Sequence, residues 1–229
     1  MLGFGRMDAL NMREYKPMKI RSLVAVTLIA SLLLTATGCN SKKSTFGPEQ
    51  LAEYAEKSGA NGYDDIDEWV EYHYDWPLME DGIYLTFEGK DADDAIESES
   101  EAIFLREYNI ENVTSGTFYR IGNRDKGCAL QCVSFTFKSA KDAENFYSQW
   151  DKNMQTAAKF NEEVDLYDSS EEKGLCHNFY DRPGNIKAAY CQGKDVFVFQ
   201  AFGPDDDTVY DFADTICEGL SIESPTSIL

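Results

Sequence analysis

Apolar positions recur along most of the chain with the periods of strands and helices. Alternating or unbroken apolar runs, rich in aromatic and β-branched residues, predict strands at 82–87, 118–121, 128–137, 175–180, 186–191 and 195–202. Apolar residues spaced three and four apart predict helices that begin near Pro48, Asp64, Asp91, Ser139 and Pro204. Hairpin-linked strands with separate helices favour an α+β fold, an antiparallel sheet with helices packed on one face.

The second half of the chain contains two similar strand-strand-helix units. Phe137 and Phe202 lie 65 residues apart, and each ends a predicted strand just before a helix cap. This spacing suggests a duplicated unit, although two copies can also resemble each other by chance.

The N-terminus has a different pattern. A basic start at Met18 leads into an apolar run at 23–34, which small residues follow up to Cys39. A membrane-spanning helix needs about 20 apolar residues, more than this run supplies, so the pattern predicts a cleaved export signal over 1–38. The true start is predicted at Met18, because Asp8 and Glu14 interrupt the positive region before it.

Residues 35–39, Thr-Ala-Thr-Gly-Cys, resemble the lipobox of bacterial lipoproteins, with Ala36 where leucine is most common. In that family the cysteine receives a diacylglyceryl group and becomes the new N-terminus. The resemblance implies that Cys39 is lipidated and holds the protein to the cell membrane on its extracytoplasmic face. The remaining chain is then predicted as a tether at 39–47, a single α+β domain at 48–222 and a flexible tail at 223–229.

A Phe-x-Phe strand precedes a helix that carries Asp142, Ala143, Phe146 and Tyr147, and a late aromatic strand precedes a final helix. With the acidic helix after the tether, this order is similar to a loose class of uncharacterised lipoproteins of Gram-positive anaerobes. The resemblance implies a fold and a location, and it brings no activity with it.

Charge narrows the choice of partners. Without residues 1–38 the chain has 16 basic and 39 acidic residues, a net charge of -23, which disfavours nucleic acid and anionic lipid. Residues 49–109 alone hold 19 acidic and 3 basic residues. A cationic partner or divalent ions would prefer this half, although such charge also fits a solvated, soluble surface.

Five cysteines remain after Cys39, and an oxidising location favours disulfides among them. Cys176 and Cys191 lie symmetrically about Pro183-Gly184, so a hairpin would place them opposite each other. A four-residue loop at 182–185 would make them a non-hydrogen-bonded pair with Cα atoms about 4.5 Å apart, which predicts a disulfide.

The other three cysteines are Cys128, Cys132 and Cys217. Cys128 and Cys132 would lie about 13 Å apart along a strand, too far to bridge each other. One of the two is a candidate to pair with Cys217, which leaves an odd cysteine.

Motifs for catalysis are absent from the sequence. His73 falls on the apolar stripe of a helix and His177 lies in a strand, so structural roles are favoured for both. Aspartates at 91–94 and 205–207 lack the alternation and central glycine of a calcium loop and fit helix starts better. We therefore expect no catalytic residues, metal or cofactor.

One segment has the composition of a binding surface. Aromatic side chains surround an acidic pair, as on surfaces that bind carbohydrates or cationic peptides. These residues are Tyr72, Tyr74, Trp76, Glu80, Asp81 and Tyr84.

The sequence therefore favours a tethered, non-catalytic binding or interaction module with a cationic protein or glycan as its partner and no nucleic acid. The alternative is a hydrolase that acts on envelope material through two carboxylates about 5 to 10 Å apart, one of them buried. A solute-binding lipoprotein is a third hypothesis, but the chain is short for two lobes around a ligand.

Overall fold

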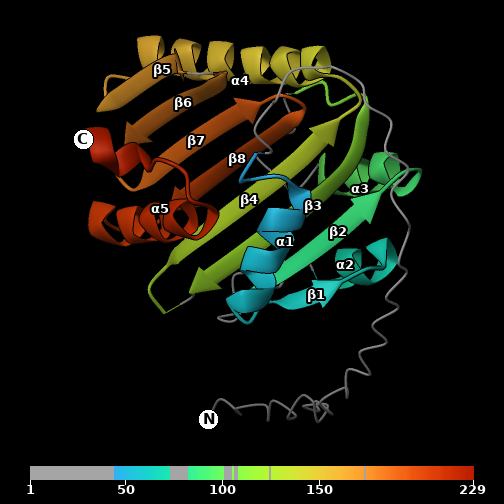
Figure 1. Ribbon diagram of the computed structural model, residues 1–229. Coiled ribbons are helices and arrows are strands. Elements are labelled where there is room, and N and C mark those ends of the chain that lie inside the picture. Colours follow the sequence, from blue (N-terminus) through green and yellow to red (C-terminus); the bar gives the residue numbers. More distant parts are fainter. Residues whose placement is uncertain (1–43, 73–81, 101–104, 106–107, 124, 173) are drawn as a thin grey trace, which may run out of the picture. The chain divides into compact units, whose positions relative to one another are not determined.

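The computed structural model describes residues 44–72, 82–100, 105, 108–123, 125–172 and 174–229 (Figure 1). One sheet runs in the order β1-β2-β3-β4-β8-β7-β6-β5. Its strands are β1 (Asn61–Tyr63), β2 (Ile83–Glu88), β3 (Val113–Asn123), β4 (Cys128–Phe137), β5 (Leu166–Glu172), β6 (Leu175–Arg182), β7 (Asn185–Gln192) and β8 (Asp195–Phe202). β1 pairs with β2 in parallel, and all other neighbouring strands pair antiparallel.

In the described ranges, five α-helices and a short 3₁₀ turn accompany the sheet, which confirms the α+β class. They are α1 (Pro48–Lys57), α2 (Ile66–Tyr72), α3 (Asp91–Ser100), α4 (Ala140–Phe160), α5 (Asp206–Leu220) and η2 (Pro225–Ile228). Among the described residues, no helix is both long and apolar enough to cross a bilayer.

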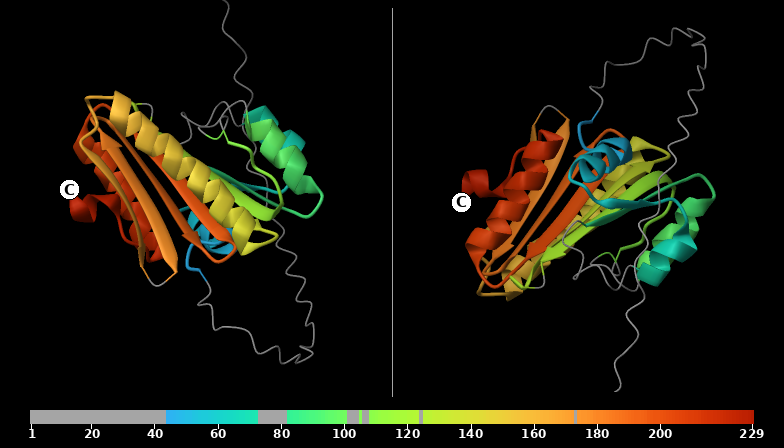
Figure 2. Two further views of the ribbon diagram at one scale, coloured as in Figure 1. Left: turned by 90° about the horizontal axis from the view of Figure 1, so that it is seen from above. Right: turned by 90° about the horizontal axis from the view of Figure 1, so that it is seen from below.

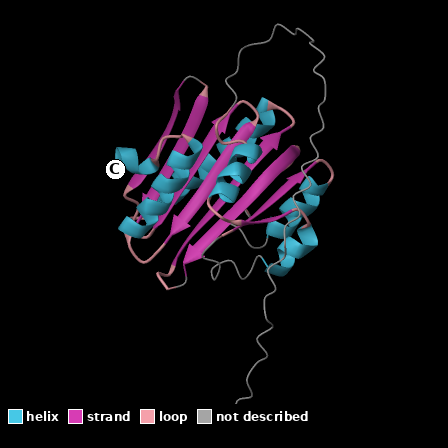
Figure 3. Cartoon of the chain, turned by 60° about the horizontal axis from the view of Figure 1, so that its bottom comes forward, coloured by secondary structure: helices cyan, strands magenta, loops and turns pink. Residues whose placement is uncertain are grey.

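The helices cover both faces of the sheet (Figure 2). The sequence predicts helices on one face alone, and this part of the prediction is wrong. α2, α3 and α4 pack on one face around Trp69, Phe135 and Trp150. α1 and α5 lie beside each other on the opposite face around Phe179 and Phe197 (Figure 3). Strands β4 and β8 are buried on both sides, because alternate residues of each strand enter different cores.

The two similar units of the sequence do not repeat in space. β4 and β8 end at Phe137 and Phe202 and lead to helices capped by Ser139 and Asp205, as expected. The helices nevertheless pack on opposite faces of the sheet. A duplication that kept the geometry of the unit would place both helices on the same side.

Residues 44–47, predicted as part of the tether, belong to the folded domain. The Phe46 side chain is fully buried against the rings of Tyr190 and Phe197, with centroids 6.0 and 6.4 Å away. The Ser134 hydroxyl donates to the Phe46 carbonyl at 2.6 Å. Burial of a large aromatic side chain is favourable, so this segment is more stable packed against the core than solvated as part of a tether.

The predicted flexible tail is also folded onto the domain. Ser224 accepts a hydrogen bond from the Thr226 N–H, which starts η2, and Pro225 is buried. The Ser224 hydroxyl donates to Asp214 on α5 at 2.6 Å, and Tyr190 donates to the Glu223 carbonyl at 2.5 Å. These contacts hold the C-terminus on the α5 side of the sheet.

Candidate functional site

The aromatic and acidic segment proposed from the sequence lies largely outside the described residues. This applies to Tyr74, Trp76, Glu80 and Asp81, and to the side chain of Tyr72 at the end of α2. Tyr84 is described, and it is half-buried on the α1 side of the sheet, the face opposite Phe87. Its pKa is raised, mainly by burial and also by the nearby Glu56.

The described residues instead form a groove beside β2, between α2, α3 and the start of α1. It consists of two adjoining hollows of about 520 and 420 Å³, which share Asp64, Thr86, Phe87 and Asp91. We call it the acidic groove, after the carboxylates that line it, all of them exposed: Glu49, Asp64, Asp65, Asp67, Glu88, Asp91, Asp94 and Glu97. No lysine or arginine is among its described lining residues.

Helix starts explain where part of this charge comes from. Asp65 precedes α2 and accepts hydrogen bonds from the N–H groups of Asp67 and Glu68 at 2.8 and 3.2 Å. Asp91 and Asp94 lie in the first turn of α3, where the helix dipole stabilises negative charge. The two helix starts meet at the groove, so carboxylates that stabilise separate helices also create one acidic surface.

Where the groove crosses β2, no described strand lies beside its edge. β1 pairs with β2 only as far as Tyr63 and Leu85. Thr86, Phe87 and Glu88 continue β2 along the groove, and no described strand pairs with them on this side. An unpaired strand edge offers backbone hydrogen-bonding groups to an extended partner.

Asp181 on β6 is a buried carboxylate outside the groove. Its side chain is 1% exposed and accepts a hydrogen bond from the Tyr210 hydroxyl at 2.9 Å, while Oδ1 has no hydrogen-bond partner among the described residues. Burial raises the pKa of Asp181, Tyr210 opposes this effect, and Asp206 and Asp165 add to it. Asp181 lines neither hollow of the acidic groove.

We expect Asp181→Asn to flatten the pH dependence of stability. Because the folded-state pKa is raised, Asp181 costs no stability below the ordinary pKa of about 3.9, and it lowers the free energy of unfolding as pH rises above that value. The amide oxygen still accepts the hydrogen bond from Tyr210. As pH approaches 7, the free energy of unfolding of the variant should therefore exceed that of the wild type by on the order of 1 kcal/mol. Urea unfolding between about pH 4 and pH 8 measures how steeply the free energy of unfolding changes with pH.

The exposed Asp207→Asn is the control for this experiment, because it removes one aspartate from α5 without affecting a buried group. Its slope should match that of the wild type. An Asp181→Asn slope equal to that of the wild type would contradict the raised pKa.

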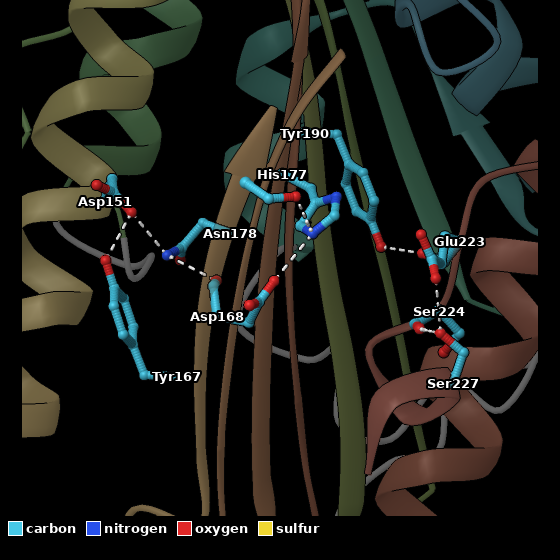
Figure 4. A network of polar contacts seen from close by, with 10 residues as sticks. Asp151, Tyr167, Asp168, His177, Asn178, Tyr190, Glu223, Ser224 and Ser227 are labelled. Carbon is cyan, nitrogen blue, oxygen red and sulfur yellow. Dashed lines mark hydrogen bonds and ion pairs between the residues drawn. The ribbon is translucent and has the colours of Figure 1, made fainter. Parts of the chain in front are cut away.

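A serine, a histidine and an aspartate also meet on β5 and β6 (Figure 4). Ser170 Oγ lies 3.0 Å from His177 Nε2, and Asp168 Oδ2 lies 3.1 Å from the same nitrogen. A catalytic triad needs the hydroxyl and the carboxylate on different ring nitrogens. The His177 ring also stacks on Phe179 with centroids 4.3 Å apart. The cluster therefore fits a structural contact between β5 and β6.

A second polar network attaches α4 to the same strands (Figure 4). Asp151 accepts hydrogen bonds from the Tyr167 hydroxyl at 2.9 Å and from Asn178 Nδ2 at 2.8 Å. Burial and the bond to Asp151 raise the pKa of Tyr167 to about 12. The phenol therefore remains a hydrogen-bond donor at neutral pH, which suits a structural contact.

Cys176 and Cys191 are partners in the register of β6 and β7, as the symmetry of the sequence predicts. The strands pair up to Arg182 and Asn185, so the loop has two residues rather than the four at 182–185 considered from the sequence. Gly184 permits this tight turn with φ 68°. Counted from the closing pair, the cysteines form a hydrogen-bonded pair, for which Cα atoms lie about 5.5 Å apart, still within disulfide range.

Both cysteines are free thiols in the structure, as are Cys128, Cys132 and Cys217. Burial raises the pKa of Cys191 to about 12, and the adjacent Cys176 adds to the shift. Such a thiol forms little thiolate at neutral pH and exchanges slowly. The bridge between Cys176 and Cys191 stays a prediction.

Comparisons with known proteins give no guide to the function of the site. Among the described residues, no three His, Cys, Asp or Glu side chains are placed to hold a metal ion. No known family model matches the chain, and a search of curated proteins finds no match. The acidic groove is the described feature best suited to binding.

Proposed function

We propose that the protein is a lipoprotein, anchored through Cys39 on the extracytoplasmic face of the membrane, that binds a cationic partner in the acidic groove. The observation that carries the proposal is the lining of the groove, whose described residues include eight carboxylates and no basic side chain. Close carboxylates repel one another, and a partner with several positive charges removes that repulsion.

The open edge of β2 supports a partner with an extended backbone. A basic peptide or loop laid beside Thr86 and Glu88 would continue the sheet where β1 ends. Val70, with 38% of its surface exposed, supplies apolar surface within the same groove. A peptide can use all three features, whereas a glycan would gain little from the carboxylates.

The groove geometry supports binding over the hydrolase alternative. That mechanism requires a buried carboxylate that faces a second one across a cleft. All carboxylates of the groove are exposed, and the buried Asp181 does not line it.

Neutralising three groove carboxylates together is expected to weaken the binding of an oligolysine peptide. The triple variant Asp64→Asn, Asp91→Asn, Asp94→Asn keeps side-chain size and helix-start hydrogen bonding. Exposed ion pairs contribute about 0.2–1 kcal/mol each, so we expect affinity to fall about tenfold. Titration of the labelled peptide at low and moderate salt measures the loss and its screening.

A matched control removes the same charge elsewhere, through Asp207→Asn, Glu163→Gln and Glu218→Gln, all at exposed positions outside the groove. It should bind the peptide nearly as well as the wild type. Equal losses in both triple variants would show that net charge, not the groove, attracts the peptide, and the proposal would fail.

A further inference from the structure

The chain enters the folded domain beside the acidic groove. Ser44, the first described residue, donates to the Asp195 carboxylate at the start of β8, and Thr136 on β4 donates to the same carboxylate at 2.6 Å. Thr136 is the register partner of Ser115 on β3, and Ser115 lines the groove. The entry of the chain and the groove are therefore at the same end of the sheet.

The strand spacing gives the distance between the entry and the groove. Asp195 on β8 and Glu88 on β2 are connected through register partners on β4 and β3. Three strand spacings of about 4.8 Å place Glu88 about 14 Å from Asp195. The first two residues of α1, Pro48 and Glu49, follow the entry directly and also line the groove.

The proposed anchor is close to this end of the sheet as well. Five residue steps separate Cys39 from Ser44, and a fully extended chain of that length spans at most about 18 Å. Together with the distance across the strands, this length puts Glu88 no more than about 40 Å from the lipid-bearing residue. The groove therefore stays close to the membrane surface.

The exposure of the groove favours a partner that is confined to the same layer. All of its described carboxylates are exposed, and exposed ion pairs contribute little each and are weakened by salt. Two molecules anchored in one membrane meet at a higher effective concentration than a soluble pair, which strengthens binding without any new contact. A groove of this kind on an anchored protein is suited to a partner that is itself held at the membrane.

We propose that the acidic groove binds a basic, membrane-proximal segment of a second membrane-held protein on the extracytoplasmic face. The inference rests on the proposed function, and it adds where the cationic partner is held. Basic residues can be exported within long segments, which cross the membrane largely regardless of their charge. The eight described carboxylates of the groove supply the complementary charge.

A lipid-linked probe tests whether the groove reaches a partner at the membrane surface. Oligolysine is joined directly to a lipid in phosphatidylcholine vesicles, whose neutral headgroups leave the lysines available to the protein. The full lipidated protein is reconstituted in the same vesicles with a donor dye on Lys194→Cys, an exposed position outside the groove. Burial raises the pKa of the five native thiols, so the added exposed cysteine reacts first.

Energy transfer to an acceptor dye on the probe measures binding, and soluble oligolysine serves as the competitor. We expect the lipidated protein to need about 100-fold more competitor for half-displacement than Cys39→Ser, because only the lipidated protein meets the probe within one membrane. The lipidated triple variant Asp64→Asn, Asp91→Asn, Asp94→Asn should show only the transfer between dyes that share a membrane by chance.

The possible failures are distinguishable. If the lipidated protein holds the probe no more tightly than Cys39→Ser does, while soluble oligolysine still binds the wild type better than the triple variant, the membrane-held partner is overturned and the cationic partner stands. If soluble oligolysine binds the wild type and the triple variant equally, the proposed function itself is overturned. Wild-type protein that leaves the vesicles would overturn the anchor.

Discussion

Replacing Cys39 with serine is expected to remove every acyl chain from the protein. Serine lacks the thiol that would receive the proposed diacylglyceryl group, and each buried methylene of a lipid chain contributes about 0.8 kcal/mol to membrane attachment. Intact-mass analysis of the N-terminal peptide measures the change directly. The wild-type peptide should begin at Cys39 and carry lipid, and the variant peptide should carry none.

Cys128→Ser is the control for the loss of a thiol, because Cys128 is buried in the folded domain and should leave the lipid in place. A wild-type peptide with an unmodified Cys39 would contradict the anchor, whatever the variant shows. The proposed localisation would then lose its basis.

Replacing Phe46 with alanine is expected to lower the free energy of unfolding by about 3–5 kcal/mol, the range for truncating a buried aromatic residue. Phe46 is fully buried between α1, α5 and the sheet, in contact with Tyr190 and Phe197. Its loss removes aromatic contacts and leaves a cavity where the chain enters the domain. Urea unfolding monitored by circular dichroism measures the change.

Phe160→Ala provides a matched comparison, because Phe160 ends α4 with 84% of its surface exposed. Its effect should stay within about 0.5 kcal/mol. If Phe46→Ala lowers the free energy of unfolding no more than Phe160→Ala does, the segment at 44–47 is not part of the core. The tether predicted over 39–47 would then be correct.

The strands that carry strong apolar patterns were predictable. The patterns at 128–137 and 195–202 match β4 and β8 closely. β5 was missed because Leu166–Glu172 is largely polar and forms an edge of the sheet. The second helix layer had a signal in the sequence, since β4 is apolar on both faces and such strands are covered on both sides.

The candidate site was less predictable. Its carboxylates come from α1, the start of α2, the end of β2 and α3, and each group alone fits a helix start or a solvated surface. The excess of acidic residues between 49 and 109 was the available signal. It indicated the region but not the groove, because the meeting of two helix starts at an open strand edge depends on tertiary packing.

In the described part of the chain, helices cover both faces of the sheet, and acidic residues stand at strand ends along both of its edges. β5 ends with Glu171 and Glu172, and the free part of β2 ends with Glu88. Copies held by the proposed anchor would share a two-dimensional surface, where chance collisions between neighbours are frequent. Edge-to-edge strand pairing between two copies would bring like charges together, so the charge that defines the groove also protects crowded copies from aggregation.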